Sequence, residues 1–310
     1  MRTILFLGGF GFISTNILKY IDKHFSDKYQ VVVFDWFPYH PHGISFNCVK
    51  KIYSGNFSDE SNIIKIFEEN QIDLVCHLLS STVPTTSGNA QYDVETNLIP
   101  TLKLLGIMDK YGVRQIVYFS SGGAVYGDFL QKVHNEEDAV YPKSSYGVVK
   151  LAIEKYLLSY AELYGFHSLI LRLSNPFGPY QYNNKQGVIN IAIRKALIGE
   201  SLEIWGKGNG LKDYIYIEDV CDIVLKLIAN DVIDTGVYNI ASGMSLSVNE
   251  IVDYIRTFIP NFNTTHVNAS MVDVQNFELD ITKLRLKLGG IKMTPFKEAL
   301  KKTIEWQKSN

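Results

Sequence analysis

Short apolar runs alternate with amphipathic stretches along the first half of this chain, and this alternation constrains its fold more than any other feature. The apolar runs are residues 3–8, 31–35, 73–79, 115–120 and 168–173. The stretches with apolar residues at helical spacing are 12–25, 59–70, 92–111 and 147–164. Continuous apolar runs are typical of parallel strands buried on both faces, and such strands are joined by crossover helices. The pattern predicts an α/β fold with a doubly wound parallel sheet.

The second half departs from this regular pattern after Arg172. A loop-like stretch precedes an expected helix at 188–198, and another expected helix at 218–229 precedes an apolar strand at 236–242. We expect this strand to return to the main sheet, so that a smaller α/β domain is interleaved with the first. The predicted first domain is 1–171 plus about 214–242, and the second is about 172–213 plus 243–310.

The composition excludes several classes of protein. Of the 310 residues, 46% are hydrophobic and 20% charged, as in ordinary globular proteins. A formal net charge of −2 gives no electrostatic reason to bind nucleic acid or an anionic membrane, and no segment has the ~20 uninterrupted apolar residues of a membrane span. The three cysteines, Cys48, Cys76 and Cys221, form neither a disulfide framework nor a metal-binding pair. These features favour a cytoplasmic protein without a metal site.

The segment GGFGFIS, at residues 8–14, follows the first apolar run and opens the first amphipathic stretch. Gly8 permits a tight turn there, and Gly11 lets the backbone approach a pyrophosphate at the N-terminus of the helix. Asp35 ends the second apolar run, where a carboxylate accepts hydrogen bonds from ribose hydroxyls and repels a 2′-phosphate. The sequence therefore predicts a Rossmann-like dinucleotide site that prefers NAD to NADP.

The segment SYGVVK places Tyr146 and Lys150 four residues apart, on one face of an expected helix. A free tyrosine has a pKa near ~10 and is a poor base at neutral pH. A lysine ammonium one turn away, together with an oxidised nicotinamide, favours the phenolate. The pair therefore predicts proton transfer by Tyr146, assisted by Lys150.

Together these segments resemble the extended short-chain dehydrogenase/reductase family, and within it the nucleotide-sugar 4-epimerases of the UDP-galactose 4-epimerase type. The resemblance covers nearly the whole chain. Its further motifs are GNFSD, HLLSS, ETNLIPTLKLL, SSGGAVYG, RLSNPFGP, GKGNGLKDYIYIEDV and YNIASG. It implies an NAD-dependent enzyme that acts on a UDP- or dTDP-hexose, and a homodimer formed through helices 92–111 and 147–164.

The resemblance also implies roles for individual residues that match the family motifs. Implied to contact NAD are Gly8, Gly11, Phe12, Ile13, Asp35, Asn56, Phe57, Leu78, Ser80, Asn97, Tyr146 and Lys150. Implied to contact the nucleotide sugar are Ser120, Asn175, Gln186, Gly187, Trp205, Lys212 and Phe277. The implied catalytic residues are Tyr146, Lys150 and Ser121.

One catalytic hydroxyl of the family has no direct counterpart in the segment SSGGAVYG. When VYG is aligned, the family's Ser or Thr falls on Gly122, and Ser120 and Ser121 precede it. We expect Ser121 to supply the hydroxyl, because the glycines allow the loop to tighten. The alternatives are that Ser120 supplies it, or that Tyr146 handles the proton alone.

Two family arginines that hold the substrate diphosphate are also replaced. The first corresponds to Lys212, which keeps the charge but lacks the bidentate fork of a guanidinium, and the second to Ser270, which is uncharged. Diphosphate binding is therefore expected to be weaker or to use other residues. Phe277 falls where the family admits or excludes an N-acetyl group, so its bulk favours a hexose over an N-acetylhexosamine.

The sequence predicts epimerisation at C4 through a 4-keto sugar, with Tyr146 as acid and base. A 4,6-dehydratase needs an Asp–Glu pair, and a UDP-glucuronate decarboxylase a Glu, near Gly123 and Ala124, so both are disfavoured. A 4-ketosugar reductase needs only the Tyr–Lys pair, although a carboxylate at the ribose fits its usual NADPH poorly. An NAD-binding protein with impaired catalysis is the alternative from another class, to which Gly122 and the replaced arginines point.

Overall fold

The first half of the chain forms the alternating strands and helices that its sequence predicts. A computed structural model of the protein describes residues 1–82, 88–127, 133–183, 186–268 and 276–310. The strands are β1 (Arg2–Leu7), β2 (Tyr29–Asp35), β3 (Val49–Ser54), β4 (Leu74–His77), β5 (Gln115–Ser121), β6 (Val133–His134), β7 (His167–Leu173), β8 (Asn175–Phe177), β9 (Leu202–Trp205), β10 (Leu211–Tyr216), β11 (Gly236–Ile240), β12 (Ser245–Leu246), β13 (Thr264–Val267) and β14 (Asn276–Leu279). The helices are α1 (Phe12–His24), α2 (Glu60–Glu69), α3 (Ala90–Asp93), the π-helical η1 (Val94–Leu98), α4 (Ile99–Lys110), α5 (Gly122–Tyr126), α6 (Ser145–Tyr164), α7 (Val188–Leu197), α8 (Ile217–Leu227), α9 (Val248–Arg256), α10 (Thr282–Lys287) and α11 (Phe296–Ser309).

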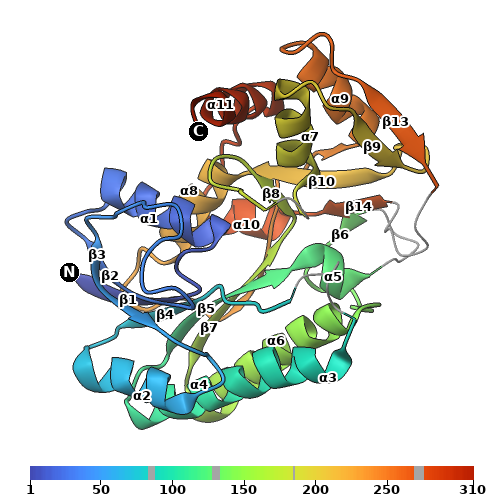
Figure 1. Cartoon of the computed structure of the whole chain (residues 1–310). Coiled ribbons are helices and arrows are strands. Elements are labelled where there is room, and N and C mark those ends of the chain that lie inside the picture. The colour runs from blue at the N-terminus through green and yellow to red at the C-terminus, as the bar shows by residue number, and fades with distance from the viewer. Residues whose placement is uncertain (83–87, 128–132, 184–185, 269–275) are drawn as a thin grey trace. The chain divides into compact units, whose positions relative to one another are not determined.

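Seven strands form the main sheet, in the order β11-β7-β5-β4-β1-β2-β3 (Figure 1). β1 pairs in parallel with β2 on one side and with β4 on the other, so the strand order reverses at β1. In open α/β sheets, ligands bind outside the carboxyl ends of the strands at such a reversal. The predicted fold class, a doubly wound sheet of the Rossmann type, is confirmed, and β11 returns to this sheet beside β7 as expected.

Apolar side chains from the strands and helices of this sheet form a continuous core. Leu7 of β1 and Ile116 of β5 are buried together with Ile66 of α2, Leu104 of α4 and Ile153 of α6. Figure 1 shows α2, α4 and α6 on one side of the sheet. These buried positions account for the helical periodicity of the sequence between the strands.

β3 is the strand of the main sheet that the sequence did not predict. It pairs in parallel with β2 at the edge of the sheet, and its residues VKKIYS are partly or fully exposed along its length. An edge strand with charged residues lacks the continuous apolar run of its buried neighbours. For this reason the pattern used for the other strands does not identify it.

The chain divides into two compact units. The first contains Met1–Val125, Pro142–Arg172 and Cys221–Tyr238, and the second contains Tyr126–Tyr141, Leu173–Val220 and Asn239–Asn310. The segment 126–141 therefore groups with the second unit, whereas the division made from sequence left it in the first domain. The assignment of one domain to the cofactor and the other to the substrate stays a prediction.

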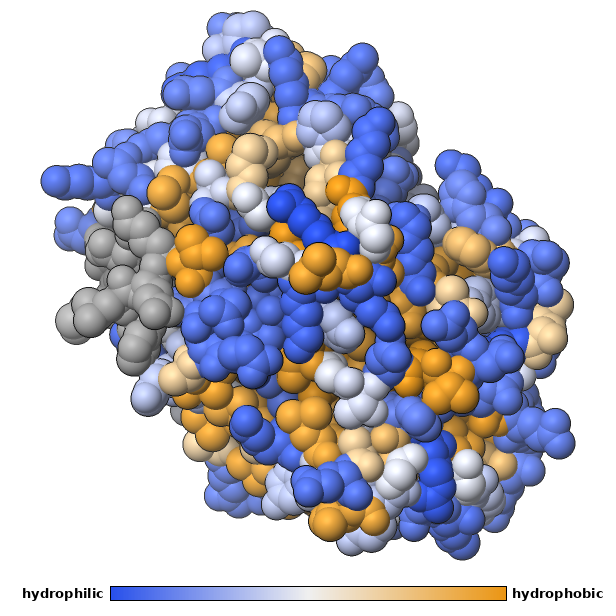
Figure 2. Space-filling view, turned by 180° about the vertical axis from the view of Figure 1, so that it is seen from behind, coloured by the Kyte–Doolittle hydropathy of each residue, from blue (hydrophilic) through white to orange (hydrophobic). Residues whose placement is uncertain are grey.

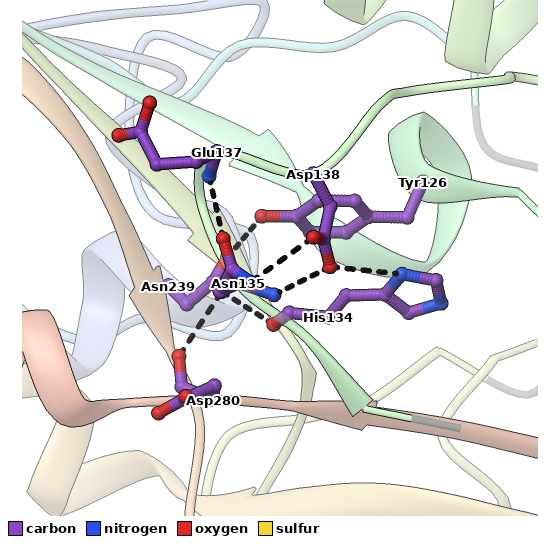
Figure 3. Close-up of polar contacts among 7 residues, drawn as sticks. All are labelled: Tyr126, His134, Asn135, Glu137, Asp138, Asn239 and Asp280. Atoms are coloured by element: carbon purple, nitrogen blue, oxygen red, sulfur yellow. Dashed lines mark hydrogen bonds and ion pairs between the residues drawn. The ribbon is translucent and has the colours of Figure 1, made fainter. Parts of the chain in front are cut away.

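In the second unit, β10 pairs with β8, β12 and β14, and β14 pairs with β6, while β9 and β13 form a separate pair. Polar contacts hold the segment around β6 in place (Figure 3). The Tyr126 hydroxyl donates to Asn239 Oδ1 at 2.9 Å, and Asn239 Nδ2 donates to the His134 carbonyl at 2.9 Å and the Asp280 carbonyl at 3.1 Å. The Asn239 amide thus joins three segments that are far apart in the sequence.

Figure 2 shows one face of the molecule, on which hydrophobic side chains are interspersed among hydrophilic ones, as on ordinary protein surfaces. Among the described residues, none of the helices has the length and apolar character needed to cross a membrane. In the same residues, no group of three or more His, Cys, Asp or Glu side chains is arranged to hold a metal ion.

Candidate active site

The turn between β1 and α1 is shaped by two glycines. Gly8 has a φ of 78°, and a Cβ there would lie 3.0 Å from backbone atoms of Leu79. Gly11 is the N-cap of α1, and a Cβ there would meet no atom closer than the Gly8 carbonyl oxygen at 3.5 Å. The Ser14 hydroxyl donates to that carbonyl at 2.6 Å and closes the turn. Space beside Gly11 and the unpaired amides of the first turn of α1 fit a pyrophosphate.

The carboxylate of Asp35 lies next to this turn, at the end of β2. Its Oδ2 accepts a hydrogen bond from the Phe10 amide at 2.9 Å. This contact fixes the carboxylate between the turn and the strand end, where an adenosine ribose would follow the pyrophosphate. Phe12 and Ile13 form the first turn of α1 and are partly buried. The residues present therefore fit the dinucleotide that the sequence predicts.

Of two adjacent residues predicted to contact the cofactor, Asn56 is exposed and Phe57 is buried. The Asn56 side chain is exposed, and its Oδ1 accepts from the Ser58 amide at 2.9 Å. The Phe57 ring is buried and meets the His77 ring edge-on, with the centroids 5.4 Å apart. The Phe57 ring is therefore part of the core, and the contact of this residue with the cofactor stays a prediction.

A pocket lies beyond the carboxyl ends of β4 and β5, between η1 and α6. The side chains that line it include Ser80, Asn97, Tyr146, Lys150, His77 and Tyr118. The first four were predicted from the sequence, and the last two were not. Leu79, not the predicted Leu78, lines this pocket.

Asn97 lies in the π-helical turn η1, a geometry that is frequent at functional sites. Its Oδ1 accepts from the Ser81 amide at 2.9 Å, and its Nδ2 donates to the Asp93 carbonyl at 3.2 Å. Asn97 thereby fixes the chain that follows β4 against α3. The Ser80 hydroxyl in that chain donates to the Thr82 carbonyl at 2.8 Å.

The two serines that end β5 have different partners. The Ser121 hydroxyl is hydrogen-bonded to the Tyr146 hydroxyl in the first turn of α6. The Ser120 hydroxyl is buried and donates to the Glu154 carboxylate instead. Of the two candidates, Ser121 is therefore the one that lies beside the phenol.

Gly147, next to Tyr146, allows α6 to pack closely on α5. A Cβ at this position would lie 2.3 Å from the Ala124 carbonyl oxygen and 2.9 Å from Cβ of Pro142. The Ser144 hydroxyl caps α6 by accepting from the Gly147 amide at 3.1 Å. These contacts set the start of α6 and with it the position of the Tyr146 phenol.

Lys150 is buried one turn further along α6, with 5% of its surface exposed. Its Nζ donates to the Phe119 carbonyl at 2.8 Å and lies 4.7 Å from the centroid of the Tyr118 ring and 5.7 Å from that of Tyr146. Burial lowers the pKa of Lys150 to about 8, and the Glu154 carboxylate partly opposes this change. Lys150 therefore stays protonated at neutral pH by a small margin.

Burial raises the pKa of Tyr146 to about 12, while the hydrogen bond from Ser121 lowers it. The expectation that Lys150 and an oxidised nicotinamide together favour the phenolate stays a prediction. Among the protein groups alone the net effect is a raised pKa, because desolvation disfavours the phenolate more strongly than the Ser121 hydrogen bond favours it. A positive charge placed near the phenol would lower this pKa.

A buried ion pair beneath the pocket was missed by the sequence analysis. Arg172 Nη2 lies 2.7 Å from Glu154 Oε2, and Arg172 Nε lies 3.1 Å from the same oxygen. Glu154 follows Lys150 by one helical turn, as Lys150 follows Tyr146. The same spacing that identified the Tyr–Lys pair could therefore have found Glu154.

Several residues predicted to contact the sugar nucleotide gather in the second unit. Asn175 of β8, Lys212 of β10 and Phe277 of β14 lie on neighbouring strands, and Lys212 is directly opposite Phe277. Asn175 Nδ2 donates to the Asp213 carbonyl at 2.8 Å. The Phe277 ring is buried and stacks on His134, with the centroids 6.1 Å apart.

The other predicted sugar-nucleotide residues lie apart from these strands. Trp205 ends β9 in the separate two-stranded sheet and is 59% exposed. Gln186 and Gly187 directly precede α7, and Gly187 has a φ of 85°. Ser270, the expected counterpart of a family arginine, lies outside the described residues.

Comparisons with known proteins agree on one family. The model of the NAD dependent epimerase/dehydratase family matches residues 4–241. A Methanocaldococcus jannaschii protein provisionally named UDP-glucose 4-epimerase is 32% identical over 312 residues, which cover 99% of each chain. The dTDP-glucose 4,6-dehydratase of Salmonella typhimurium is 28% identical over 99% of this chain and 93% of that protein. The crystal structure of UDP-glucose 4-epimerase from Thermotoga maritima, with UDP-glucose, has a TM-score of 0.91 at 29% identity and covers 99% of each chain.

Proposed function

Because the chain belongs to the NAD-dependent epimerase/dehydratase family, we propose that it epimerises a nucleotide sugar at C4. The substrate is of the UDP-glucose/UDP-galactose type, as in the names of the similar archaeal protein and of the Thermotoga maritima structure. The observation that carries the proposal is the hydrogen bond between the Ser121 and Tyr146 hydroxyls, in a pocket that also contains Lys150.

The proposed cofactor residues are those of the β1–α1 turn and of the strand ends beside it. Amides at the N-terminus of α1 would hold the pyrophosphate, and Asp35 would hold the adenosine ribose. Lys150 would hold the nicotinamide ribose through its remaining N–H groups. Bound NAD would supply the redox chemistry, namely oxidation of C4 to a ketone and its reduction from the opposite face.

Tyr146 has the acid–base role in this proposal. As a phenolate it accepts the proton of the C4 hydroxyl, and as a phenol it returns a proton to the same oxygen. Its pKa of about 12 makes it a phenol when only protein groups surround it. The positive charge of a bound oxidised nicotinamide would lower this pKa, so Tyr146 would ionise more readily with the oxidised cofactor in place.

Ser121 and Lys150 support Tyr146 in different ways. The Ser121 hydroxyl lies beside the phenol and would hydrogen-bond the sugar oxygen as its charge develops. The ammonium of Lys150 stabilises the phenolate electrostatically. Gly122 carries no hydroxyl, so Ser121 takes the place of the residue that the family usually has there.

A dehydratase reaction is the main alternative, because one of the similar proteins is a 4,6-dehydratase. That reaction needs an acid and a base beyond Tyr146 to remove water across C5 and C6. Gly122, Gly123 and Ala124, at the start of α5, supply no carboxylate for it. The lack of acid–base side chains at these three positions favours simple epimerisation.

The test is a proton NMR time course of the purified protein with UDP-galactose, and separately with UDP-glucose, without added cofactor. Interconversion of the two anomeric signals is the expected result, and Tyr146→Phe is expected to abolish it. Loss of the C6 hydroxymethylene signal would instead identify a dehydratase. Consumption of added NADH or NADPH with a 4-keto sugar would identify a reductase.

No change with any of several UDP- and dTDP-hexoses, despite bound NAD, would overturn the epimerase proposal. The replacements at Gly122 and Lys212 would then be marks of impaired catalysis. If UDP-N-acetylglucosamine reacts as fast as UDP-glucose, the preference for hexoses attributed to Phe277 would be wrong.

A further inference from the structure

Lys150 has few groups around it that can stabilise its charge. Its ammonium has three N–H donors, of which one bonds the Phe119 carbonyl. The nearest carboxylate, Glu154, already receives Arg172 through two nitrogens and the Ser120 hydroxyl. Among the described residues, no ion pair is formed by Lys150 itself. The aromatic ring of Tyr118 is therefore one of the few groups near Lys150 that can stabilise the ammonium charge.

Tyr118 presents its ring to this ammonium from the middle of the sheet. Its side chain is 1% exposed, and the ring centroid lies 4.7 Å from Lys150 Nζ, closer than the 5.7 Å of the Tyr146 ring. A cation within about 6 Å of a ring centroid is attracted by the ring quadrupole, and more strongly so when it is desolvated. Tyr118 is part of β5, so its ring is fixed by the sheet.

The hydroxyl of Tyr118 does not explain why this residue occupies the position. It is buried and has no hydrogen-bond partner among the described residues. A buried unpaired hydroxyl destabilises a protein relative to a phenylalanine at the same place. The neighbouring His77 is paired with Tyr118 across β4 and β5, and their ring centroids are 5.4 Å apart. The contribution of Tyr118 to the site is therefore its ring.

We propose that Tyr118 is a positioning residue for the acid–base pair, in which the face of its ring keeps the Lys150 ammonium charged and directed at Tyr146. This inference rests on the proposed acid–base role of Tyr146. It adds a residue of β5 to a site otherwise built from α6 and the end of β5. In this assignment the ring acts through Lys150.

The charged and titratable groups around Lys150 support this assignment. Glu154 and Tyr146 lie on its own helix, Arg172 lies on β7, and His77 lies on β4. Burial lowers the pKa of His77 to about 3, so His77 contributes no charge at neutral pH. Burial raises the pKa of Tyr118 well above its ordinary value, so Tyr118 acts as a neutral ring. Arg172 offsets part of the charge of Glu154, so the ring face is a stabilising contact in addition to that carboxylate.

Removal of the Tyr118 ring should lower the pKa of Lys150 and raise that of Tyr146. A desolvated cation–π contact is strong enough to shift a lysine pKa by about one unit or more. Without the contact, the pKa of Lys150 falls from about 8 toward neutral pH, and part of the protein loses the ammonium. Tyr146 then loses its positive neighbour, so the pH at which its phenolate forms must rise.

The experiment compares Tyr118→Phe, which keeps the ring, with Tyr118→Leu, which removes it. The readout is a pH titration of tyrosinate absorbance in protein loaded with NAD, with Tyr146→Phe as the blank. We expect the Tyr146 transition of Tyr118→Phe to match that of the wild type, and that of Tyr118→Leu to rise by about one pH unit. The acidic limb of the epimerase pH profile should move by the same amount.

Two results would overturn the proposal. One is a folded, NAD-loaded Tyr118→Leu protein whose Tyr146 transition is unchanged. The other is an equal shift in Tyr118→Phe, which would assign the effect to the hydroxyl. Tyr118→Met, with an unbranched side chain of large volume, replaces Tyr118→Leu if thermal unfolding shows that the latter does not fold. Absence of epimerase activity would count against the proposed function alone, because the absorbance titration needs no sugar substrate.

Discussion

At the scale of single residues, the role of each side chain in the site follows from its hydrogen-bond partner. Ser120 and Ser121 are adjacent in the sequence, but Ser120 is hydrogen-bonded to the buried Glu154 and Ser121 to the Tyr146 phenol. Both partners belong to α6, and the two serines reach different ones because successive side chains of β5 alternate in direction. The two serines therefore form a matched pair for mutation.

Ser121→Ala is expected to lower kcat by about a hundredfold, the usual loss when a positioned acid–base or oxyanion partner is removed. Its thermal stability should stay close to that of the wild type, because the Ser121 hydroxyl is only partly buried. Steady-state kinetics with UDP-galactose, together with thermal unfolding, measure both quantities.

Ser120→Ala is the control for this prediction. It removes a buried hydrogen bond to Glu154, so it should lower the free energy of unfolding by about 1.5–3 kcal/mol and change kcat little. An unchanged kcat in Ser121→Ala would show that Tyr146 handles the proton alone. A large loss of kcat in Ser120→Ala, without one in Ser121→Ala, would exchange the roles of the two serines.

At the scale of elements, the position of Tyr146 depends on how closely α6 approaches α5. Gly147→Ala would bring a methyl group within 2.3 Å of the Ala124 carbonyl oxygen, and backbone on a rigid element cannot move aside cheaply. We expect the free energy of unfolding to fall by about 1–3 kcal/mol. Because α6 carries both Tyr146 and Lys150, kcat should fall as well. Urea unfolding and steady-state kinetics measure these effects.

Gly106→Ala is the matched control on α4. A Cβ at Gly106 would meet no atom within 4 Å, so the helix propensity of alanine should stabilise this variant by up to about 1 kcal/mol. Equal stability of the two variants would contradict the close approach of α6 and α5. It would also remove the structural reason for a glycine after the tyrosine.

Most elements of the first unit were predictable because their burial pattern is periodic. Strands such as β1 and β5 are buried along almost their whole length, and α6 shows its helical spacing in the sequence. β3 escaped prediction because an exposed edge strand has no such pattern. The burial of the Phe57 ring could not be predicted, because a short motif does not report which way a side chain points.

The site was predictable to the extent that its residues share one helix or one turn. Tyr146 and Lys150 could be identified by their spacing together with the surrounding motifs, as could the glycines beside α1. Tyr118 and Arg172 could not, because they meet α6 only through the pairing of strands distant in the sequence. The pKa of Tyr146 is likewise a property of burial, which the spacing of residues does not describe.

At the scale of the whole molecule, the homodimer stays a prediction, and the exposed face of α6 makes it testable. Val148, Tyr156 and Leu163 are exposed at intervals of about two helical turns, so they lie on one face of the helix. Figure 1 shows α6 beside α4, where Ile99 is also exposed. Apolar side chains repeated along neighbouring helices are typical of a surface that another copy covers.

Tyr156→Glu is expected to convert a dimer into a monomer, because the interface would bury an unpaired carboxylate in place of an aromatic ring. Tyr156 is 45% exposed in the single chain, so the monomer should still fold. Leu286→Glu is the control, since Leu286 is 79% exposed on α10, a helix of the second unit, whereas α6 belongs to the first. Sedimentation velocity at micromolar concentration should give a dimer for the wild type and for Leu286→Glu, and at least a hundredfold weaker association for Tyr156→Glu. A monomeric wild type would refute the dimer, and a dimeric Tyr156→Glu would place its interface on a different face of the chain.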